Sequence, residues 1–232
     1  MNQYTTRNGT RRRFLNHLAK ICLVVGGALG AAGALAGGAA TSASAAEDCR
    51  LVVLGDSLAA GYGVALEDAF PTQLDRALAA EGIDCEVINA GVSGDTSAGG
   101  LSRLAWVLGD EPTHLLVELG GNDALRALPV EQLEANLAAI IERSRDAGAS
   151  VMLAGMLAPP NLGTRYTEAF ADVYTQLGER FDVPLYPFFL AGAIEDPALM
   201  LEDGIHPNAA GVAAIVERML PVVTAWLEQP TG

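Results

Sequence analysis

After residue 45, short apolar runs alternate with longer amphipathic stretches along the rest of the chain. The apolar runs are 51–54, 87–88, 115–119, 151–153 and, weakest, 183–186, and the amphipathic stretches are 69–81, 96–108, 130–146, 167–180 and 209–227. Short strands separated by helices of about a dozen residues indicate βαβ units and a mostly parallel sheet with helices on both faces. We therefore expect an α/β fold that binds ligands outside the carboxyl ends of its strands.

Charge divides the chain into two parts. Residues 1–45 contain no acid but five cations, which are Arg7, Arg11, Arg12, Arg13 and Lys20. The 232 residues contain 14 Lys+Arg, so residues 46–232 contain 14 − 5 = 9 cations, and all nine are arginine. The same residues contain all 28 acids, which gives them a net charge near −19. Nucleic-acid binding needs clustered Lys and Arg to neutralise phosphates, so this function is disfavoured.

The first 45 residues have the three parts of a signal peptide. Basic residues at 11–13 precede Phe14, a weakly apolar stretch covers 21–40, and Ala43-Ser44-Ala45 forms an A-x-A cleavage site. The paired arginines resemble a twin-arginine signal, which exports a folded protein. The alternatives are a general secretory signal and a retained membrane anchor, although the glycine content favours removal. We expect an exported domain, residues 46–232, periplasmic or secreted, without a permanent membrane anchor.

Cys49 and Cys85 remain once the signal peptide has been removed together with Cys22. Each stands just before an apolar run. If the two runs are neighbouring parallel strands, both sulfurs lie at the same end of the sheet, in a compartment where disulfides persist. We predict a disulfide between them, and the alternative is a pair of buried free thiols.

Three turns at predicted strand ends, and one turn before the last helix, carry polar residues. They are Gly55-Asp56-Ser57, the run 89–96, Gly120-Gly121-Asn122-Asp123 and the run 203–208. Taken singly, each is an ordinary turn or helix cap. Taken together, they hold a set of groups that one chemical reaction requires.

That reaction is hydrolysis of an acyl bond by serine, which needs a hydroxyl, a base, a group that orients the base, and donors for the developing oxyanion. Ser57 can expose its hydroxyl at a strand-to-helix turn, where backbone N–H groups point to one side. His206 can take the proton, while Asp203 accepts the Nδ1–H and leaves Nε2 free. The N–H of Gly94, which no side chain obstructs, and the amide of Asn122 can donate to the oxyanion.

These blocks, in this order, resemble the GDSL or SGNH hydrolases. The runs 93–96, 117–123 and 203–208 are similar to those of the bacterial branch that contains periplasmic arylesterases, acyl-CoA thioesterases and lysophospholipases, and the resemblance covers about residues 50–228. It implies a three-layer αβα sandwich, flavodoxin-like, with a parallel five-stranded sheet of order 2-1-3-4-5. That order makes the strands after Cys49 and Cys85 neighbours.

Position by position, the resemblance implies that Ser57 is the nucleophile, His206 the base and Asp203 its partner. The N–H of Ser57, the N–H of Gly94 and the amide of Asn122 would form the oxyanion hole. The implied function is a serine esterase that hydrolyses aryl esters, lysophospholipids or acyl thioesters through an acyl-enzyme intermediate. No metal or organic cofactor is implied.

Four further residues are expected to take no part in the chemistry. Ala59 stands where serine is common in the family, a departure that we do not expect to affect the chemistry. Asp56 is interpreted as the cap of the following turn, and Asp123 as a turn or cap residue. His114 stands at the start of the third strand, opposite the site, and is interpreted as structural.

The stretch 156–166 follows the fourth strand and so leaves the active-site end of the sheet. Its apolar residues and glycine suit a movable lip over an acyl chain, and the alternative is a plain surface loop. We expect substrate contacts from Leu157, Ala158, Pro159, Pro160, Asn161 and Leu162.

Two other functions use the same sequence features. One is a carbohydrate O-deacetylase with the same catalytic groups, and the other is a non-catalytic, flavodoxin-like binding module. A net charge near −19 disfavours polyanions and anionic membranes and leaves neutral or zwitterionic esters as substrates. We expect a monomer, and a rate that falls at low pH as His206 is protonated.

Overall fold

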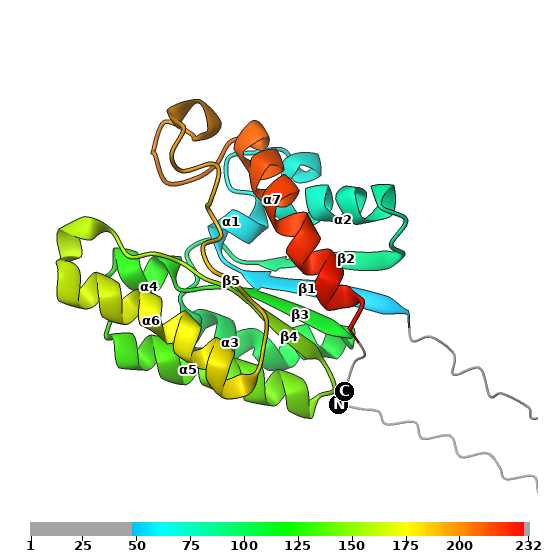
Figure 1. The fold of residues 1–232 in the computed structure, drawn as a ribbon, viewed down its shortest axis with the longest axis horizontal. Helices are drawn as coiled ribbons and strands as arrows, with labels where there is room; N and C mark the ends of the chain where they lie inside the picture. The colour runs from blue at the N-terminus through cyan, green and yellow to red at the C-terminus, as the bar shows by residue number, and fades with distance from the viewer. Residues whose placement is uncertain (1–47, 230–232) are drawn as a thin grey trace, which may run out of the picture. The chain divides into compact units, whose positions relative to one another are not determined.

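A five-stranded parallel sheet organises residues 48–229, the part of the chain that this computed structural model describes (Figure 1). The strand order β2-β1-β3-β4-β5 is the one that the family resemblance implied. The strands are β1 (Cys49–Gly55), β2 (Cys85–Gly91), β3 (His114–Glu118), β4 (Ser150–Ala154) and β5 (Leu185–Tyr186). The predicted signal peptide, with its arginine pair and Cys22, lies outside the described residues.

Helices cover both faces of the sheet and make a three-layer sandwich (Figure 1). On one face, α2 (Phe70–Ala80) packs against α7 (Ala209–Leu227). On the other, α5 (Val130–Asp146) packs between α3 (Ser97–Val107) and α6 (Thr164–Phe181). Right-handed crossovers explain the division, because β1 to β2 runs toward one edge of the sheet and the later crossovers run toward the other.

The central strands are apolar on both faces, as strands covered by helices must be. Residues 51–54 of β1 and 115–116 of β3 are completely buried. The edge strand β5 keeps only Leu185–Tyr186 of the predicted 183–186. A short edge strand presents few unpaired backbone groups to other chains.

Two short helices were not predicted from the sequence. They are α1 (Ser57–Ala60), separated from β1 by Asp56 alone, and α4 (Gly121–Leu125), separated from β3 by two residues. Each is only about one turn long, so neither contains a hydrophobic repeat that periodicity could detect. Both begin at the carboxyl edge of the sheet, where the polar turns were predicted to meet.

Cys49 and Cys85 are aligned across the β1–β2 pair and joined by a disulfide. His114 lies buried at the start of β3, and its ring meets Trp226 of α7 edge-on at 4.9 Å between centroids. Burial lowers the pKa of His114. This environment fits the structural interpretation of His114, and both features lie at the sheet edge opposite the polar turns.

Candidate functional site

Ser57 is the first residue of α1, and Asp56 alone separates it from the end of β1. Asp56 caps this helix, as predicted, because its Oδ1 accepts the N–H of Leu58 at 3.0 Å. The turn is tight: a Cβ at Gly55 would lie only 2.5 Å from the Cβ of Ala59. A residue without a side chain at 55 therefore lets the chain turn sharply and present Ser57 at the sheet edge.

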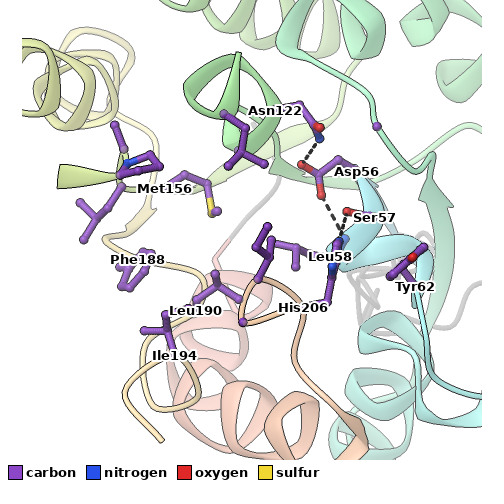
Figure 2. Close-up of a pocket in the computed structure, with 18 of the residues that line it drawn as sticks. Asp56, Ser57, Leu58, Tyr62, Asn122, Met156, Phe188, Leu190, Ile194 and His206 are labelled. Carbon is purple, nitrogen blue, oxygen red and sulfur yellow. Dashed lines mark hydrogen bonds between the residues drawn. The ribbon is translucent and has the colours of Figure 1, made fainter. Parts of the chain in front are cut away.

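Ser57, His206 and Asp203 form a continuous hydrogen-bonded chain, and Figure 2 shows its first link, between Ser57 and His206. The Oγ of Ser57 lies 2.8 Å from Nε2 of His206, and Nδ1 of His206 lies 2.7 Å from Oδ2 of Asp203. Oδ1 of Asp203 also accepts the backbone N–H groups of His206 (3.0 Å) and Ile205 (2.9 Å). These two backbone bonds, followed by the bond to the imidazole, lower the pKa of Asp203 to about 2.

An ionised Asp203 only accepts hydrogen bonds, so Nδ1 of His206 carries the hydrogen and Nε2 is left to accept from Ser57. This is the tautomer that removal of the serine proton requires. The three residues predicted as nucleophile, base and orienting acid are therefore brought together in a geometry that suits those roles.

His206 is held by the long segment between β5 and α7, residues 187–208. The segment folds back on itself, with the N–H of Leu201 donating to the carbonyl of His206 (2.8 Å) and that of Asn208 to the carbonyl of Leu199 (2.9 Å). The side chain of Asn208 then caps α7, accepting the N–H of Gly211 at 3.0 Å. The imidazole of His206 is thus fixed immediately before the last helix.

Tyr62 is a neighbour of His206 that the sequence reasoning missed. Its ring centroid lies 4.4 Å from that of the imidazole, at an interplanar angle of 38°. Tyr62 is about half exposed and also lines the pocket described below. Contact from the ring limits the positions open to the imidazole.

Gly94 and Asn122, which were predicted to donate to the oxyanion together with the N–H of Ser57, line the same pocket as Ser57. Gly94 adopts a φ of +85°, which favours glycine, and its carbonyl accepts a bond of 2.8 Å from Nη2 of Arg126. Asn122 lies in α4, and Arg126 caps the end of the same helix. Arg126 therefore ties the Gly94 loop to the helix that carries the other donor.

Beneath these groups, two acids are buried together. Asp56 accepts the side-chain amide of Asn122 on Oδ2 at 3.0 Å, and its backbone N–H donates to Oε2 of Glu118 at 3.2 Å. Asp56 is 2% exposed and Glu118 is not exposed at all. Burial, the largest cause, raises the pKa of Asp56 and raises that of Glu118 well above its usual value; for Glu118, the nearby Asp56 adds to the effect. Sequence reasoning missed Glu118, because it ends an otherwise apolar strand.

Asp123 is also buried, but it serves a different element. Its carboxylate accepts the backbone N–H of Ser97 at 2.7 Å and the hydroxyl of Ser97 at 2.6 Å. Ser97 begins α3, so Asp123 supports the start of that helix. The interpretation of Asp123 as a cap residue therefore holds, although the helix that it caps is not its own.

A pocket of about 650 Å³ opens beside Ser57, and most of its lining is apolar. Figure 2 shows part of the wall opposite His206, formed by Met156, Phe188 and Leu190. Phe188 and Leu190 come from the 187–208 segment, just past the carboxyl end of β5. The rule that ligands bind at strand ends could have identified them, but the weak β5 signal concealed where that strand ends. The remaining apolar lining is Leu58, Leu125, Leu157, Ala158, Pro159, Pro160, Ile194 and Ile205.

The predicted substrate loop contributes only its first part to this pocket. Residues 157–160 line it, whereas 161 and 162 do not. Leu162 ends a short 3₁₀ helix, Pro160–Leu162, and packs against the core instead. The prediction that Asn161 and Leu162 contact substrate is therefore not supported by their position. Among residues 48–229, no three His, Cys, Asp or Glu side chains gather as a metal site.

Comparison with known proteins gives a consistent result. The model of the GDSL-like lipase/acylhydrolase family matches residues 53–214. Esterase TesA of Pseudomonas aeruginosa is 43% identical over 178 residues, which are 76% of this chain and 89% of that protein. An arylesterase of Vibrio mimicus is 42% identical over 76% of this chain and 88% of its own. Thioesterase 1/protease 1/lysophospholipase L1 of Escherichia coli is 43% identical over 72% and 79%, respectively.

Solved structures agree with the fold. The crystal structure of TesA matches with a TM-score of 0.73 at 42% identity and covers 76% of this chain and 98% of that one. The psychrotrophic esterase EstA from Pseudoalteromonas sp., in a structure inhibited by monoethylphosphonate, matches with a TM-score of 0.75 at 38% identity and covers 78% of this chain and 100% of that one.

Proposed function

The chain belongs to the GDSL-like lipase/acylhydrolase family and is a carboxylic-ester hydrolase, and from this premise we propose how its residues divide the work. Ser57 is the nucleophile, His206 is the general base and Asp203 orients His206. The backbone N–H groups of Ser57 and Gly94 and the side-chain amide of Asn122 bind the oxyanion. The observation that carries the proposal is the unbroken chain from Ser57 through His206 to an ionised Asp203, at 2.8 and 2.7 Å.

The reaction proceeds in two acyl-transfer steps. Ser57 Oγ attacks the ester carbonyl while His206 Nε2 takes its proton, and the charge that forms on the carbonyl oxygen is met by the three donors. His206 then returns the proton to the leaving alcohol as the acyl-enzyme forms. In the second step, His206 takes a proton from water as the water attacks the acyl group. The bond between the acyl carbon and Ser57 Oγ then breaks, His206 returns the proton to Oγ, and the carboxylic acid is released.

Removal of the Ser57 hydroxyl tests this assignment. Ser57→Ala should abolish hydrolysis of p-nitrophenyl butyrate and labelling by a fluorophosphonate probe, with the melting temperature unchanged. Ser102→Ala is the matched control, because Ser102 is an exposed serine of α3 whose hydroxyl donates to the carbonyl of Gly99. Labelling of the Ser57→Ala protein at wild-type rate would reject Ser57 as the nucleophile.

For the substrate, we propose esters with an apolar acyl or aryl group and a neutral or zwitterionic remainder. The apolar pocket beside Ser57 supports the first half, and the acidic body of the chain supports the second. Aryl esters, lysophospholipids and acyl thioesters are the classes named for the relatives above. A kcat/KM panel across acyl lengths and head groups ranks them. The carbohydrate O-deacetylase and the binding module are not favoured, because the relatives are esterases and thioesterases.

We further propose that the domain is exported, through the twin-arginine pathway, and works in the periplasm or outside the cell as a monomer without a permanent anchor. The arginine pair and the A-x-A site of residues 1–45 support this. Replacing Arg12 and Arg13 with lysine should trap the precursor in the cytoplasm, whereas a general secretory signal would still export it. Light scattering on the exported protein should give a monomer mass.

A further inference from the structure

The side-chain amide of Asn122 contacts the pocket on one side and a buried carboxylate on the other. Its Nδ2 donates to Oδ2 of Asp56 at 3.0 Å, and Asn122 lines the pocket together with Ser57 (Figure 2). An amide nitrogen carries two hydrogens. One can therefore bond Asp56 while the other remains for an oxygen of the substrate.

A carboxamide has two orientations of nearly the same shape, which differ in whether nitrogen or oxygen faces a neighbour. Only the orientation with nitrogen toward the pocket can stabilise an oxyanion. The carboxylate of Asp56 favours one of these two orientations of Asn122. Its Oδ1 already accepts the N–H of Leu58. Its Oδ2 accepts a hydrogen bond from Asn122 Nδ2, but it would repel the amide oxygen of Asn122 in the other orientation.

We propose that Asp56 is a positioning residue for ester hydrolysis, which fixes the Asn122 amide with its N–H groups available to the oxyanion. The inference rests on the proposed role of Asn122 as an oxyanion donor. Because Asp56 is only 2% exposed, water cannot readily replace its bond to Asn122. A donor that is already oriented costs no reorganisation when charge develops, which is the condition for a large rate effect.

Asp56→Asn is the informative substitution because it keeps the size of the side chain and its ability to cap α1. With its oxygen on Leu58, the new amide presents nitrogen to Asn122, which then turns its own oxygen toward residue 56. The orientation of Asn122 is thereby disturbed. We expect kcat to fall roughly 10- to 100-fold with KM near the wild-type value, since the lost interaction belongs to the transition state.

A double-mutant cycle separates this role from a general structural one. Asn122→Ala alone should lower kcat by about 10²- to 10³-fold, as loss of one oxyanion donor does. In that background, adding Asp56→Asn should cost less than about twofold, because the group through which Asp56 acts is gone. Asp123→Asn is the matched control: Asp123 is equally buried but bonds Ser97, so its effect should be the same in both backgrounds.

The outcomes are distinct. An unchanged kcat for Asp56→Asn, or losses that add in the cycle, would overturn the inference while leaving the proposed function intact. An unchanged kcat for Asn122→Ala would instead reject the proposed role of Asn122, and the inference with it. If Asp56→Asn does not fold, Asp56→Ser serves in the same cycle, since its hydroxyl still caps α1 but is too short to reach Asn122.

Discussion

The carboxyl group of Glu118 accepts the backbone N–H of Asp56 at 3.2 Å, at the foot of the turn that presents Ser57. Glu118 is fully buried in β3, and its Oε1 has no hydrogen-bond partner in the described part of the chain. Burial and the neighbouring Asp56 both raise its pKa. The chain thus keeps an acid that favours the neutral form directly under its catalytic turn.

The first prediction concerns the pH dependence of stability in Glu118→Gln. A carboxyl whose folded pKa is raised above its usual 4.5 contributes stability that is present below that value and is lost as pH rises through the folded pKa. Glutamine has no such dependence. The variant's free energy of unfolding, relative to wild type, should therefore increase with pH, by at most about 1.4 kcal/mol per pH unit. Urea unfolding between about pH 5 and 8 measures it, and a constant difference would contradict the argument.

The second prediction concerns Asp203→Asn. The amide oxygen can still accept the backbone N–H groups of Ile205 and His206, but the ionised partner of Nδ1 is lost. We expect kcat to fall by roughly 10³- to 10⁴-fold, as when the acid of a Ser-His-Asp triad becomes an amide. Because the wild-type pKa is about 2, Asp203 stays charged throughout the working range. A fall of the wild-type kcat/KM toward low pH, above about pH 4, should therefore not come from Asp203.

The third prediction concerns Arg126, which holds the Gly94 loop. In Arg126→Ala the carbonyl of Gly94 loses its partner, and the N–H of Gly94 becomes less well oriented. We expect kcat/KM to fall about tenfold, or about 1.4 kcal/mol, close to the lower end of what a hydrogen bond to a charged group contributes. Arg180→Ala is the control, because Arg180 is an exposed arginine that pairs with Glu142 at 3.8 Å. Equal effects of the two substitutions on kcat/KM would show that charge, not the Gly94 contact, matters.

The fourth prediction concerns acyl length. Leu190 lies in the apolar wall of the pocket and is 6% exposed, so Leu190→Trp should fill space that a long acyl chain occupies. The ratio of kcat/KM for dodecanoyl over butanoyl p-nitrophenyl esters should drop, by at least about tenfold. Val222→Trp, on the outer face of α7, provides the same change away from the pocket. A ratio unchanged by Leu190→Trp would place the acyl chain elsewhere.

The fifth prediction concerns the Cys49–Cys85 disulfide, which closes a loop with a sequence separation of 36 residues. Replacing both cysteines with serine should lower the free energy of unfolding by about 3–4 kcal/mol on the chain-entropy model, with kcat unchanged because the bridge lies at the opposite sheet edge. Thiol titration of the unfolded exported protein should find no free thiol. Two titratable thiols would show that the bridge does not form.

The sequence predicted the fold because the fold depends on local patterns, and the polar turns that it singled out are the ones that the structure brings together. Apolar runs located β1 to β4, and polar turns at their ends located Ser57, Gly94 and Asn122. The position of Glu118 beneath Asp56 could not be predicted, since one acid at the end of an apolar run carries no sign of what lies across the sheet. The same holds for Tyr62, whose contact with His206 joins residues far apart in the chain.

The residues that line the pocket were predicted less completely than the polar turns, for a different reason. Residues 157–160 were predicted because their strand was clear, but the prediction ran on to 162, where a 3₁₀ helix turns the chain back to the core. Phe188 and Leu190 were missed because β5 is two residues long and nearly without a pattern. Loop paths depend on packing between distant segments, which a single sequence does not display.

The segment between β5 and α7 carries Phe188, Leu190, Asp203 and His206. It could therefore be exchanged between homologous enzymes as one piece of chain. Consider a chimera in which residues 187–208 come from an esterase that prefers a different acyl-chain length. The chimera would receive from that esterase both part of the apolar pocket lining and the proposed base. The turn that carries Ser57 and all three proposed oxyanion donors would stay with the recipient. On the proposed assignment, substrate range and proton transfer would therefore be exchanged together, whereas the attacking hydroxyl would be exchanged separately.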